Sequence, residues 1–202
     1  MVITKRIIDL TAGIVLLILF SPFFLLIAII IKFDSKGPVF FVQDRLGKDG
    51  VVFSMIKFRT MVVNAEQSGT GLFSYCDDPR ITRVGKYLRM MSLDEIPQII
   101  NVIHGSMSLV GPRPPVTYEL GDYSDFTEYM KVRFQVKPGM TGLAQVSGRN
   151  DLDWNKKIEY DNLYVEQYQR LGVIEDIVIL FRTLIVVFSM SNIIEKIPGE
   201  KK

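Results

Sequence analysis

The feature that most constrains this chain is a long apolar run near its N-terminus. Residues Leu10 to Ile31 form a stretch of 22 residues without a charged side chain. At a rise of about 1.5 Å per residue, a helix over this run would extend ~33 Å, enough to cross the hydrocarbon core of a bilayer. A cleaved signal peptide fits less well, because its apolar region is shorter and Ile31-Lys32-Phe33 offers no small-residue cleavage site. The run therefore predicts a membrane-embedded helix.

The dipeptide Ser21-Pro22 interrupts this run near its centre. Proline removes one backbone hydrogen bond and clashes with the preceding turn, so we expect a kink or a break there. Basic residues flank the run on both sides, and such residues prefer the cytoplasmic side of a membrane. These flanking residues are Lys5, Arg6, Lys32 and Lys36. They fit a re-entrant helix that enters and leaves by one face, and they fit equally a kinked helix that spans the bilayer.

A second apolar segment covers Val173 to Ile194. Its polar residues recur every seven positions, at Glu175, Arg182 and Ser189. On a helix this spacing gives a narrow polar stripe on a wide apolar surface. Such a helix suits the membrane interface, where the lysines that follow would meet anionic lipid, and it suits equally a buried core position. The two apolar segments explain a mean hydropathy of +0.23 in a chain with 23% charged residues.

The residues between the two apolar segments carry most of the charges and predict an α+β domain that is mostly helical. Two β-rich runs, Pro38–Gln43 and Val51–Phe58, are joined by a stretch that ends in Asp-Gly, which is typical of a β-hairpin. The expected helices are Val84–Met91, Leu93–Ile103, Thr117–Arg133 and Trp154–Arg170. The expected loops are residues 64–80 and Val136–Arg149.

These elements divide the chain into three parts. Residues 1–36 are expected to form a membrane helix broken at Ser21-Pro22, and residues 37–172 a globular domain. Residues 173–202 are expected to form an amphipathic, interfacial C-terminal segment. No linker separates a second soluble domain, which agrees with a length of 202 residues.

Composition and motif searches exclude several functional classes. A single cysteine, Cys76, rules out a disulfide framework, and a single histidine, His104, rules out zinc sites that need two histidines. The sequence contains neither GxxxxGK[ST] nor GxGxxG, so a P-loop or a Rossmann phosphate site is not expected. No helix-turn-helix or RRM signature is present either, and we expect no nucleic-acid partner.

Two adjacent carboxylates stand out in Ser92-Leu93-Asp94-Glu95, which has the S-x-x-E form of a capping box. This form predicts Ser92 as the N-cap of a helix and Glu95 as its third residue. Asp94 would then lie in the first turn, where the helix dipole favours an ionised carboxylate. The plainer interpretation is that both carboxylates only cap the helix. Because adjacent residues point in different directions on a helix, the two are not expected to share one proton.

Basic residues lie on both sides of these carboxylates in the sequence. Arg89 precedes Asp94 by five positions, and Arg113 follows within Gly111-Pro112-Arg113-Pro114-Pro115, where prolines restrict its backbone. Guanidinium groups bind phosphate in a forked geometry, so this concentration of bases suits an anionic substrate. Ordinary solvated surface bases are the alternative interpretation.

Several motifs resemble, in this order, those of the bacterial sugar transferases, also called monotopic phosphoglycosyl transferases. They are the apolar helix with Ser21-Pro22, GPVFFVQDRLGKDG at 37–50, KFRTM at 57–61, SLDEIPQIINVIHGSMSLVGPRP at 92–114 and KPGMTGLAQVSGRN at 137–150. The similarity runs from about residue 4 to residue 170 and corresponds to the small, catalytic-core form of the family. It implies that residues 37–172 form a catalytic domain at the cytoplasmic face.

The resemblance implies an enzyme that moves a sugar-1-phosphate from a UDP-sugar to polyprenyl (undecaprenyl) phosphate and releases UMP. Such a reaction is the first membrane step in the synthesis of capsule, O-antigen, exopolysaccharide or glycoprotein glycans. The resemblance also implies a re-entrant helix and an active site at the cytoplasmic face of the bacterial inner membrane. The implied partners are UDP-sugar, polyprenyl phosphate and membrane lipid, and the sequence leaves open whether the chain forms homo-oligomers.

The same resemblance implies roles for individual residues. Asp94 matches a nucleophile that forms a covalent phosphosugar–aspartate intermediate, which predicts ping-pong kinetics. Glu95 matches its partner, which acts through Mg²⁺ or by activating the acceptor, so Asp94 and Glu95 are also the expected metal ligands. Arg89 and Arg113 are expected to contact phosphate. The residues expected to contact the nucleotide sugar are Lys57, Arg59, Gln145 and Arg149.

Two other functions would use the same sequence features. A membrane-bound nucleotide-sugar pyrophosphatase would employ the same acidic and basic residues with water as the acceptor. A non-catalytic membrane scaffold that recruits glycan-assembling enzymes would need neither carboxylate. Steady UMP release without polyprenyl phosphate would favour the pyrophosphatase, and glycan synthesis that survives Asp94→Asn would favour the scaffold.

Overall fold

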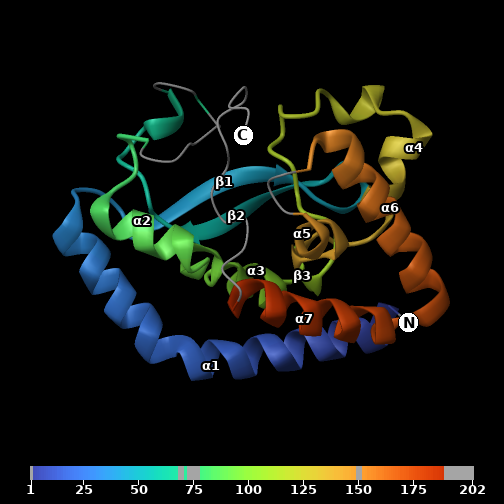
Figure 1. The fold of residues 1–202 in the computed structure, drawn as a ribbon, viewed down its shortest axis with the longest axis horizontal. Coiled ribbons are helices and arrows are strands. Elements are labelled where there is room, and N and C mark those ends of the chain that lie inside the picture. The colour runs from blue at the N-terminus through green and yellow to red at the C-terminus, as the bar shows by residue number, and fades with distance from the viewer. Residues whose placement is uncertain (1, 68–70, 72–77, 149–151, 189–202) are drawn as a thin grey trace.

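The computed structural model describes residues 2–188, apart from 68–70, 72–77 and 149–151 (Figure 1). The α-helices are α1 (Val2–Asp34), α2 (Arg83–Met90), α3 (Gln98–His104), α4 (Glu128–Lys131), α5 (Leu143–Ser147), α6 (Trp154–Leu171) and α7 (Val173–Phe188). The strands are β1 (Phe40–Leu46), β2 (Val52–Phe58), β3 (Ser108–Val110) and β4 (Gly139–Thr141). The expected α+β class, mostly helical with a small hairpin, is confirmed.

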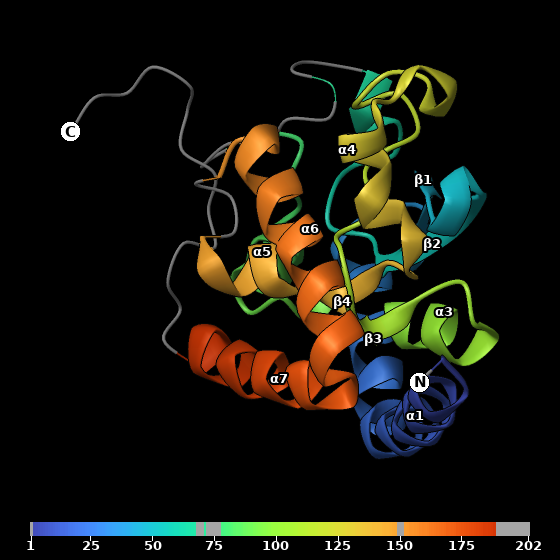
Figure 2. The same ribbon diagram turned by 90° about the vertical axis from the view of Figure 1, so that its right-hand side faces the viewer.

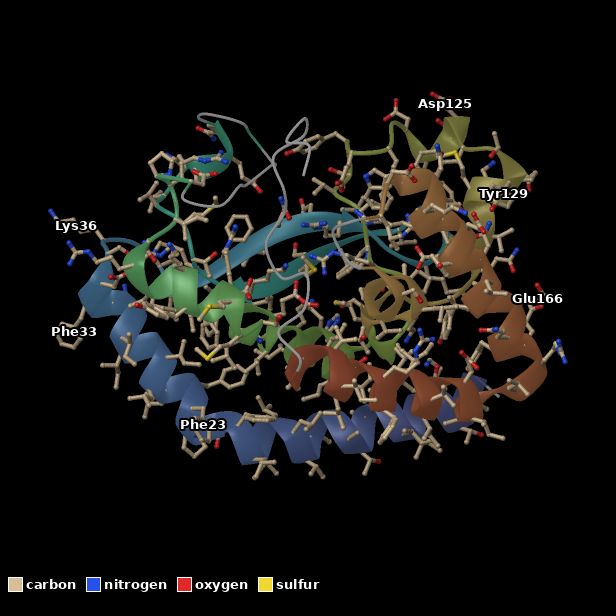
Figure 3. The ribbon with its side chains drawn as sticks, in the orientation of Figure 1. Phe23, Phe33, Lys36, Asp125, Tyr129 and Glu166 are labelled. Atoms are coloured by element: carbon tan, nitrogen blue, oxygen red, sulfur yellow. The ribbon has the colours of Figure 1, made fainter. Side chains whose placement is uncertain are left out.

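Helix α1 stays helical through Pro22 and changes direction near that residue (Figure 1). Figure 3 labels Phe23 at this bend and Phe33 near the far end of the helix. Pro22 has no N–H to donate, and the Ser21 hydroxyl donates to the carbonyl oxygen of Ile18 at 2.8 Å. Both features bend a helix locally. The expected kink is therefore present, whereas a full break is not, because the loss of one donor leaves the other backbone hydrogen bonds in place.

Both arms of α1 pack against the rest of the protein. In the first arm, Arg6 donates to two backbone carbonyl oxygens at the end of α3, at 2.6 and 2.7 Å. Beyond the bend, Ile27 and Ile31 are buried against side chains of β2 and α2. By length and composition alone, Ile3–Asp34 could cross a membrane, and 11% of its most apolar window is buried. The folded body nevertheless contacts both arms of this helix.

The start of α7 lies next to the first arm of α1, from which α7 then diverges, and the two helices form the lower face of the molecule (Figures 1 and 2). Its polar residues point inward, since Glu175 and Asp176 are both buried. Most of its apolar residues point outward, among them Ile177 and Phe181, which are 61% and 66% exposed, whereas Ile179 is buried. The predicted polar stripe is confirmed up to Phe188, and the rest of the predicted segment lies outside the described residues. A helix in water would have the opposite orientation.

The two strand pairs position the segments that carry the site. β1 and β2 form an antiparallel hairpin whose register runs from Phe40–Phe58 to Leu46–Val52. The strand therefore continues to Leu46, three residues beyond the predicted end, and the turn is correspondingly short. β3 and β4 form a short parallel pair. The main core packs α3, β3, α5, α6 and α7 together around fully buried side chains such as Val102, Met107 and Ile179.

Several helical and loop predictions are wrong, and each error has a physical cause. The single helix expected over Leu93–Ile103 is a 3-10 turn followed by α3, with Pro97 between them. The helix expected over Thr117–Arg133 is replaced by short turns around α4, because the rings of Tyr123, Phe126 and Phe134 pack on one another. The expected loop after Val136 contains β4 and α5. The predictions that correspond to α2 and α6 are confirmed to within one residue at each end.

Candidate active site

Asp94 and Glu95 lie on the 3-10 turn Leu93–Glu95, between α2 and α3. The predicted capping box is wrong: Ser92 has a left-handed backbone conformation, with φ 56° and ψ 21°, and its side chain makes no capping hydrogen bond. Pro97, not Ser92, occupies the N-cap position of α3. Neither carboxylate caps that helix, and both line the same cavity. The interpretation that both carboxylates only cap the helix is therefore wrong.

Glu95 is held by two cations that come from different parts of the chain. Lys57 Nζ, on β2, donates to Glu95 Oε1 at 2.7 Å, and Arg113 Nη1 donates to the same oxygen at 3.2 Å. Burial by itself would raise the pKa of Glu95, but the charges of Lys57 and Arg113 outweigh it and hold that pKa well below its usual range. Glu95 is thus a permanent anion with one oxygen, Oε1, fully occupied.

Asp94 is in the opposite state. Within the part of the chain that the structure describes, its carboxylate accepts no hydrogen bond and forms no ion pair. Burial raises the pKa of Asp94 to about 6; Lys57 opposes the rise and the charge of Glu95 adds to it. A carboxyl group with a pKa near 6 is still mostly ionised at pH 7. The site therefore presents an ionised but unengaged carboxylate next to one that is locked by cations.

The cations around this pair form one wall of the cavity. The side chain of Arg113 is 41% exposed, and the charge of Glu95 raises its pKa further. Burial lowers the pKa of Lys57, and Glu95 opposes that effect. Arg89, on α2, also lines the cavity and donates from Nε to Thr60 Oγ1 at 2.9 Å. The structure therefore brings together Lys57, Arg89 and Arg113, as expected for a site that receives an anion.

Two of the other predicted binding residues, Arg59 and Gln145, also line the cavity. Arg59 is 4% exposed, and its three nitrogens donate to backbone carbonyls between Ser35 and Pro38, where they fix the chain after α1. Gln145, on α5, has both amide atoms buried without a hydrogen-bond partner, and it lines the cavity. Arg149 lies outside the described residues. A role in binding nucleotide sugar stays a prediction for each of them.

Arg45 on β1 and Arg133 after α4 also line the cavity, although neither was expected to be a binding residue. Arg45 shares the inward face of β1 with Gln43, so a polar residue at alternate strand positions could have indicated it. Burial, together with the charge of Arg113, lowers the pKa of Arg45 to about 10. No local signal marks Arg133, whose burial depends on an ion pair with Asp161, 28 residues along the chain.

The cavity has a volume of about 1340 Å³ and joins the charged residues to the apolar helices. Its lining includes Phe20 of α1 and Leu180 and Leu184 of α7. Among the described residues, no group of three or more Asp, Glu, His or Cys side chains comes together to hold a metal ion. Mg²⁺ is usually bound by one or two carboxylates together with substrate phosphates, so Asp94 and Glu95 fit a Mg²⁺ that shares its coordination with a phosphate ligand.

The chain is similar in sequence to known proteins of one family. Residues 1–190 match the family described as bacterial sugar transferase. The chain is 39% identical to the exopolysaccharide production protein ExoY of Sinorhizobium fredii over 196 residues, which is 90% of this chain and 84% of that protein. It is 41% identical over 197 residues to the undecaprenyl-phosphate galactose phosphotransferase of Salmonella typhimurium. It is 42% identical over 185 residues to the UDP-glucose:undecaprenyl-phosphate glucose-1-phosphate transferase of Klebsiella pneumoniae.

The length covered differs between these relatives. The matches to the Salmonella and Klebsiella proteins take in 91% and 89% of this chain but only 40% and 39% of those proteins. The shared part includes the turn with Asp94 and Glu95 and the segment with Arg113, since each match covers about nine-tenths of the chain. The similarity therefore concerns the part of the larger relatives that corresponds to the fold described above.

Proposed function

The chain belongs to the bacterial sugar transferase family, and from that premise we propose that it transfers a sugar-1-phosphate from a UDP-sugar to polyprenyl phosphate, such as undecaprenyl phosphate, with release of UMP. The reaction would be the first membrane step in the synthesis of a surface glycan. The observation that carries the proposal is the contrast between Asp94, ionised and unengaged, and Glu95, locked by Lys57 and Arg113, within one cationic cavity.

The proposed reaction proceeds by two displacements at one phosphorus atom. An oxygen of Asp94 forms a bond to the β-phosphorus of the UDP-sugar, the bond from that phosphorus to the bridging oxygen breaks, and UMP leaves with the electron pair. A phosphate oxygen of the polyprenyl phosphate then attacks the same phosphorus, and the bond to Asp94 breaks. The products are a polyprenyl diphosphosugar and a regenerated Asp94 carboxylate. A covalent intermediate of this kind divides one difficult transfer into two steps.

The surrounding residues reduce the repulsion between a carboxylate and a diphosphate. Arg89 and Arg113 would contact the phosphates, where guanidinium groups stabilise negative charge that develops on the leaving group. Glu95 is a poor general base, because its pKa is held well below its usual range. Its hydrogen bonds fall on Oε1, so Oε2 is available to hold Mg²⁺ together with Asp94. When bound, Mg²⁺ would neutralise charge on the diphosphate.

We also propose that the protein enters the cytoplasmic leaflet of the bacterial inner membrane without crossing it. The body of the protein contacts α1 both before and after the bend, so a helix crossing the bilayer would have to lose one of these contacts. Helices α1 and α7 lie along the same side of the molecule (Figure 2), and both expose many large apolar side chains. A UDP-sugar is found in the cytoplasm, and a polyprenyl phosphate has its phosphate at the interface and its tail in lipid.

The proposal is tested by intact-protein mass spectrometry. Purified protein is mixed with a panel of UDP-sugars and Mg²⁺ without polyprenyl phosphate, and one UDP-sugar is expected to add the mass of one phosphosugar. Asp94→Asn should abolish the adduct. Asp44→Asn is a matched control, because Asp44 lies on the exposed side of β1, where it accepts a hydrogen bond from Ser54. An adduct that persists in Asp94→Asn would show that another residue is the nucleophile.

The same preparation separates the proposed transfer from hydrolysis. Without polyprenyl phosphate, UMP release should stop at about one UMP per enzyme molecule, as expected for an accumulated covalent intermediate. Addition of undecaprenyl phosphate should then restart UMP release and produce a lipid-linked diphosphosugar. Continuous UMP release without the lipid would instead identify a nucleotide-sugar pyrophosphatase.

A further inference from the structure

The turn that carries Arg113 is unusual in its backbone chemistry. Three of its four residues, Pro112, Pro114 and Pro115, have no N–H group, so the turn can make few hydrogen bonds of its own. Its carbonyl oxygens remain strong acceptors, and the three prolines are buried. Buried carbonyl groups require donors, and here the donors must come from elsewhere in the chain.

The structure provides one donor to each of the four consecutive carbonyl groups. The outer two, at positions 112 and 115, accept from backbone N–H groups of β4 and β1, at 2.9 and 3.0 Å. The inner two accept from arginine side chains. Arg133 Nη2 donates to the carbonyl oxygen of Arg113 at 2.6 Å, and Arg45 Nη1 donates to that of Pro114 at 2.9 Å.

We propose that Arg45 and Arg133, which we call the clamp arginines, are positioning residues that aim the guanidinium group of Arg113 at Glu95 and at the phosphate being transferred. The inference rests on the proposed function, because it assigns the phosphate contact to Arg113. Arg133 holds the carbonyl of Arg113, whose peptide plane adjoins the Arg113 Cα, and Arg45 holds the carbonyl of Pro114, which lies in the next peptide plane. Together they restrict the backbone from which the Arg113 side chain projects. Arg113 then contacts Glu95 at 3.2 Å and keeps 41% of its side chain exposed to the cavity.

Each clamp arginine is itself fixed by groups distant from the turn. Arg133 is 1% exposed, forms an ion pair with Asp161 of α6 at 2.8 Å, and lies over the ring of Trp154 at 5.2 Å. Arg45 uses its second terminal nitrogen to bond Gln43 on the same strand. Arg133 thus links α6 to the carbonyl of Arg113, and Arg45 links the β-hairpin to the carbonyl of Pro114.

The charge of Arg45 indicates that this residue does more than fill space in the core. Among the described residues Arg45 forms no ion pair with a carboxylate, although it lies in the cavity with Arg113. An isolated guanidinium that is largely out of water is costly to fold. An uncharged donor could satisfy one carbonyl without that cost. The planar, forked arginine instead bridges Gln43 and the Pro114 carbonyl in one fixed geometry, which a shorter or rotatable donor would not hold.

The first test observes the turn directly and does not require activity. Amide hydrogen exchange is measured by mass spectrometry on a peptide containing residues 112–116, in which Arg113 and Val116 carry the exchangeable amides. In Arg45→Met the exchange of this peptide should accelerate about 10-fold, as expected when a buried carbonyl loses its donor. A second variant, Arg133→Met combined with Asp161→Leu, removes the ion pair as a unit and should have the same effect. Unchanged exchange in both variants would overturn the clamp.

The second test asks whether the clamp acts through Arg113. In a double-mutant cycle, Arg45→Met should lower kcat/KM about 10-fold or more in the wild type and less than about 3-fold when Arg113 is already Met. All rates are measured below the Tm of each variant. Equal losses in the two backgrounds would overturn the inference, because they would show that Arg45 contacts substrate directly or acts only on stability.

Arg6→Met is the matched control for both tests. Arg6 also donates from both terminal nitrogens to two adjacent backbone carbonyls, but at the end of α3 rather than at the turn. It should lower Tm, leave exchange at residues 112–116 unchanged, and show the same fold-change in kcat/KM with and without Arg113. A wild type that releases no UMP from any UDP-sugar would refute the proposed function, while the exchange measurement would still decide whether the clamp exists.

Discussion

Two clusters of buried charge in this protein contain a lysine–carboxylate pair and use it differently. In the cavity, Lys57 pairs with Glu95 beside the unengaged Asp94. Beneath the core, Lys5 of α1 pairs with Asp176 of α7, and the hydroxyl of Tyr164 donates to the other oxygen of Asp176 at 2.7 Å. The second cluster joins α1, α6 and α7 and has a donor on each carboxylate oxygen.

The difference lies in what each cluster leaves unsatisfied. Burial raises the pKa of Asp176, and Lys5 and Tyr164 oppose the rise by bonding the ionised form. Burial likewise raises the pKa of Asp94, but no hydrogen bond from the described residues relieves it. A buried carboxylate with all its partners serves the fold, whereas one left without partners is available to a ligand. We therefore expect the Lys5–Asp176 cluster to stabilise the fold and the cavity cluster to carry the proposed reaction.

Asp94→Asn should have the largest effect on activity and almost none on stability. Loss of the proposed nucleophile is expected to lower kcat by about 10⁴-fold or more. Because Asp94 has no bonded partner among the described residues and burial disfavours its ionised form, Tm should stay the same or rise slightly. An assay of UMP release checks the effect on activity, and thermal denaturation in detergent checks the effect on stability. A Tm that falls by more than about 5 °C would show that Asp94 stabilises the fold as Asp176 does, and would contradict the contrast between the two clusters.

Asp176→Asn should show the reverse pattern. Removal of one member of a buried ion pair is expected to cost about 3–5 kcal/mol, which lowers Tm by roughly 6 to 20 °C for a chain of this size. The kcat of the folded fraction should change less than about 3-fold. A Lys5→Met variant combined with Asp176→Leu should recover most of the loss in Tm, because no charge then remains buried alone. If Asp176→Asn lowered kcat as much as Asp94→Asn, the assignment of a purely structural role to the Lys5–Asp176 cluster would be wrong.

The sequence predicts those parts of the fold that depend on local patterns. Such patterns are the apolar run of α1, the alternation in the hairpin and the periodicity of α6 and α7. Each of them is contained in a single segment of its own, and each element is found close to its predicted position. The segment Thr117–Arg133 is different, because packing among Tyr123, Phe126 and Phe134 decides its conformation. Packing between side chains that meet only after folding overrides a local preference for helix.

The site divides in the same way. Asp94 and Glu95 are recognisable as a pair, but the S-x-x-E pattern suggests a cap that the fold does not form. What occupies Glu95 instead is Lys57, 38 residues earlier, and Arg113, 18 residues later. The burial of Arg133 depends on Asp161 in another helix. No spacing in the sequence reveals such contacts, because they require the tertiary structure to bring the two groups together.

Helix α7 extends the comparison to the membrane, since the helix that turns Asp176 inward turns Phe181 outward. Phe181→Ser removes a 66% exposed aromatic ring from the apolar face. Burial of such a side chain in lipid is worth about 2 kcal/mol, so partitioning onto vesicles should weaken roughly 10- to 30-fold. Leu163→Ser is the control, because Leu163 is 40% exposed on α6. Equal losses for the two variants in a vesicle flotation assay would show that the α7 face does not select lipid.

Glu159→Gln should have the smallest effect, and it isolates burial as the cause of the differences above. The pair Lys156–Glu159 has an N–O distance of 2.7 Å, the same as that between Lys57 and Glu95. Its side chains are 57% and 59% exposed, so water and salt screen the attraction. Tm should therefore change by less than about 2 °C, and kcat should be unaffected. A shift as large as that of Asp176→Asn would mean that contact distance, rather than burial, decides what a charge pair contributes, and the contrast between the two buried clusters would then need another explanation.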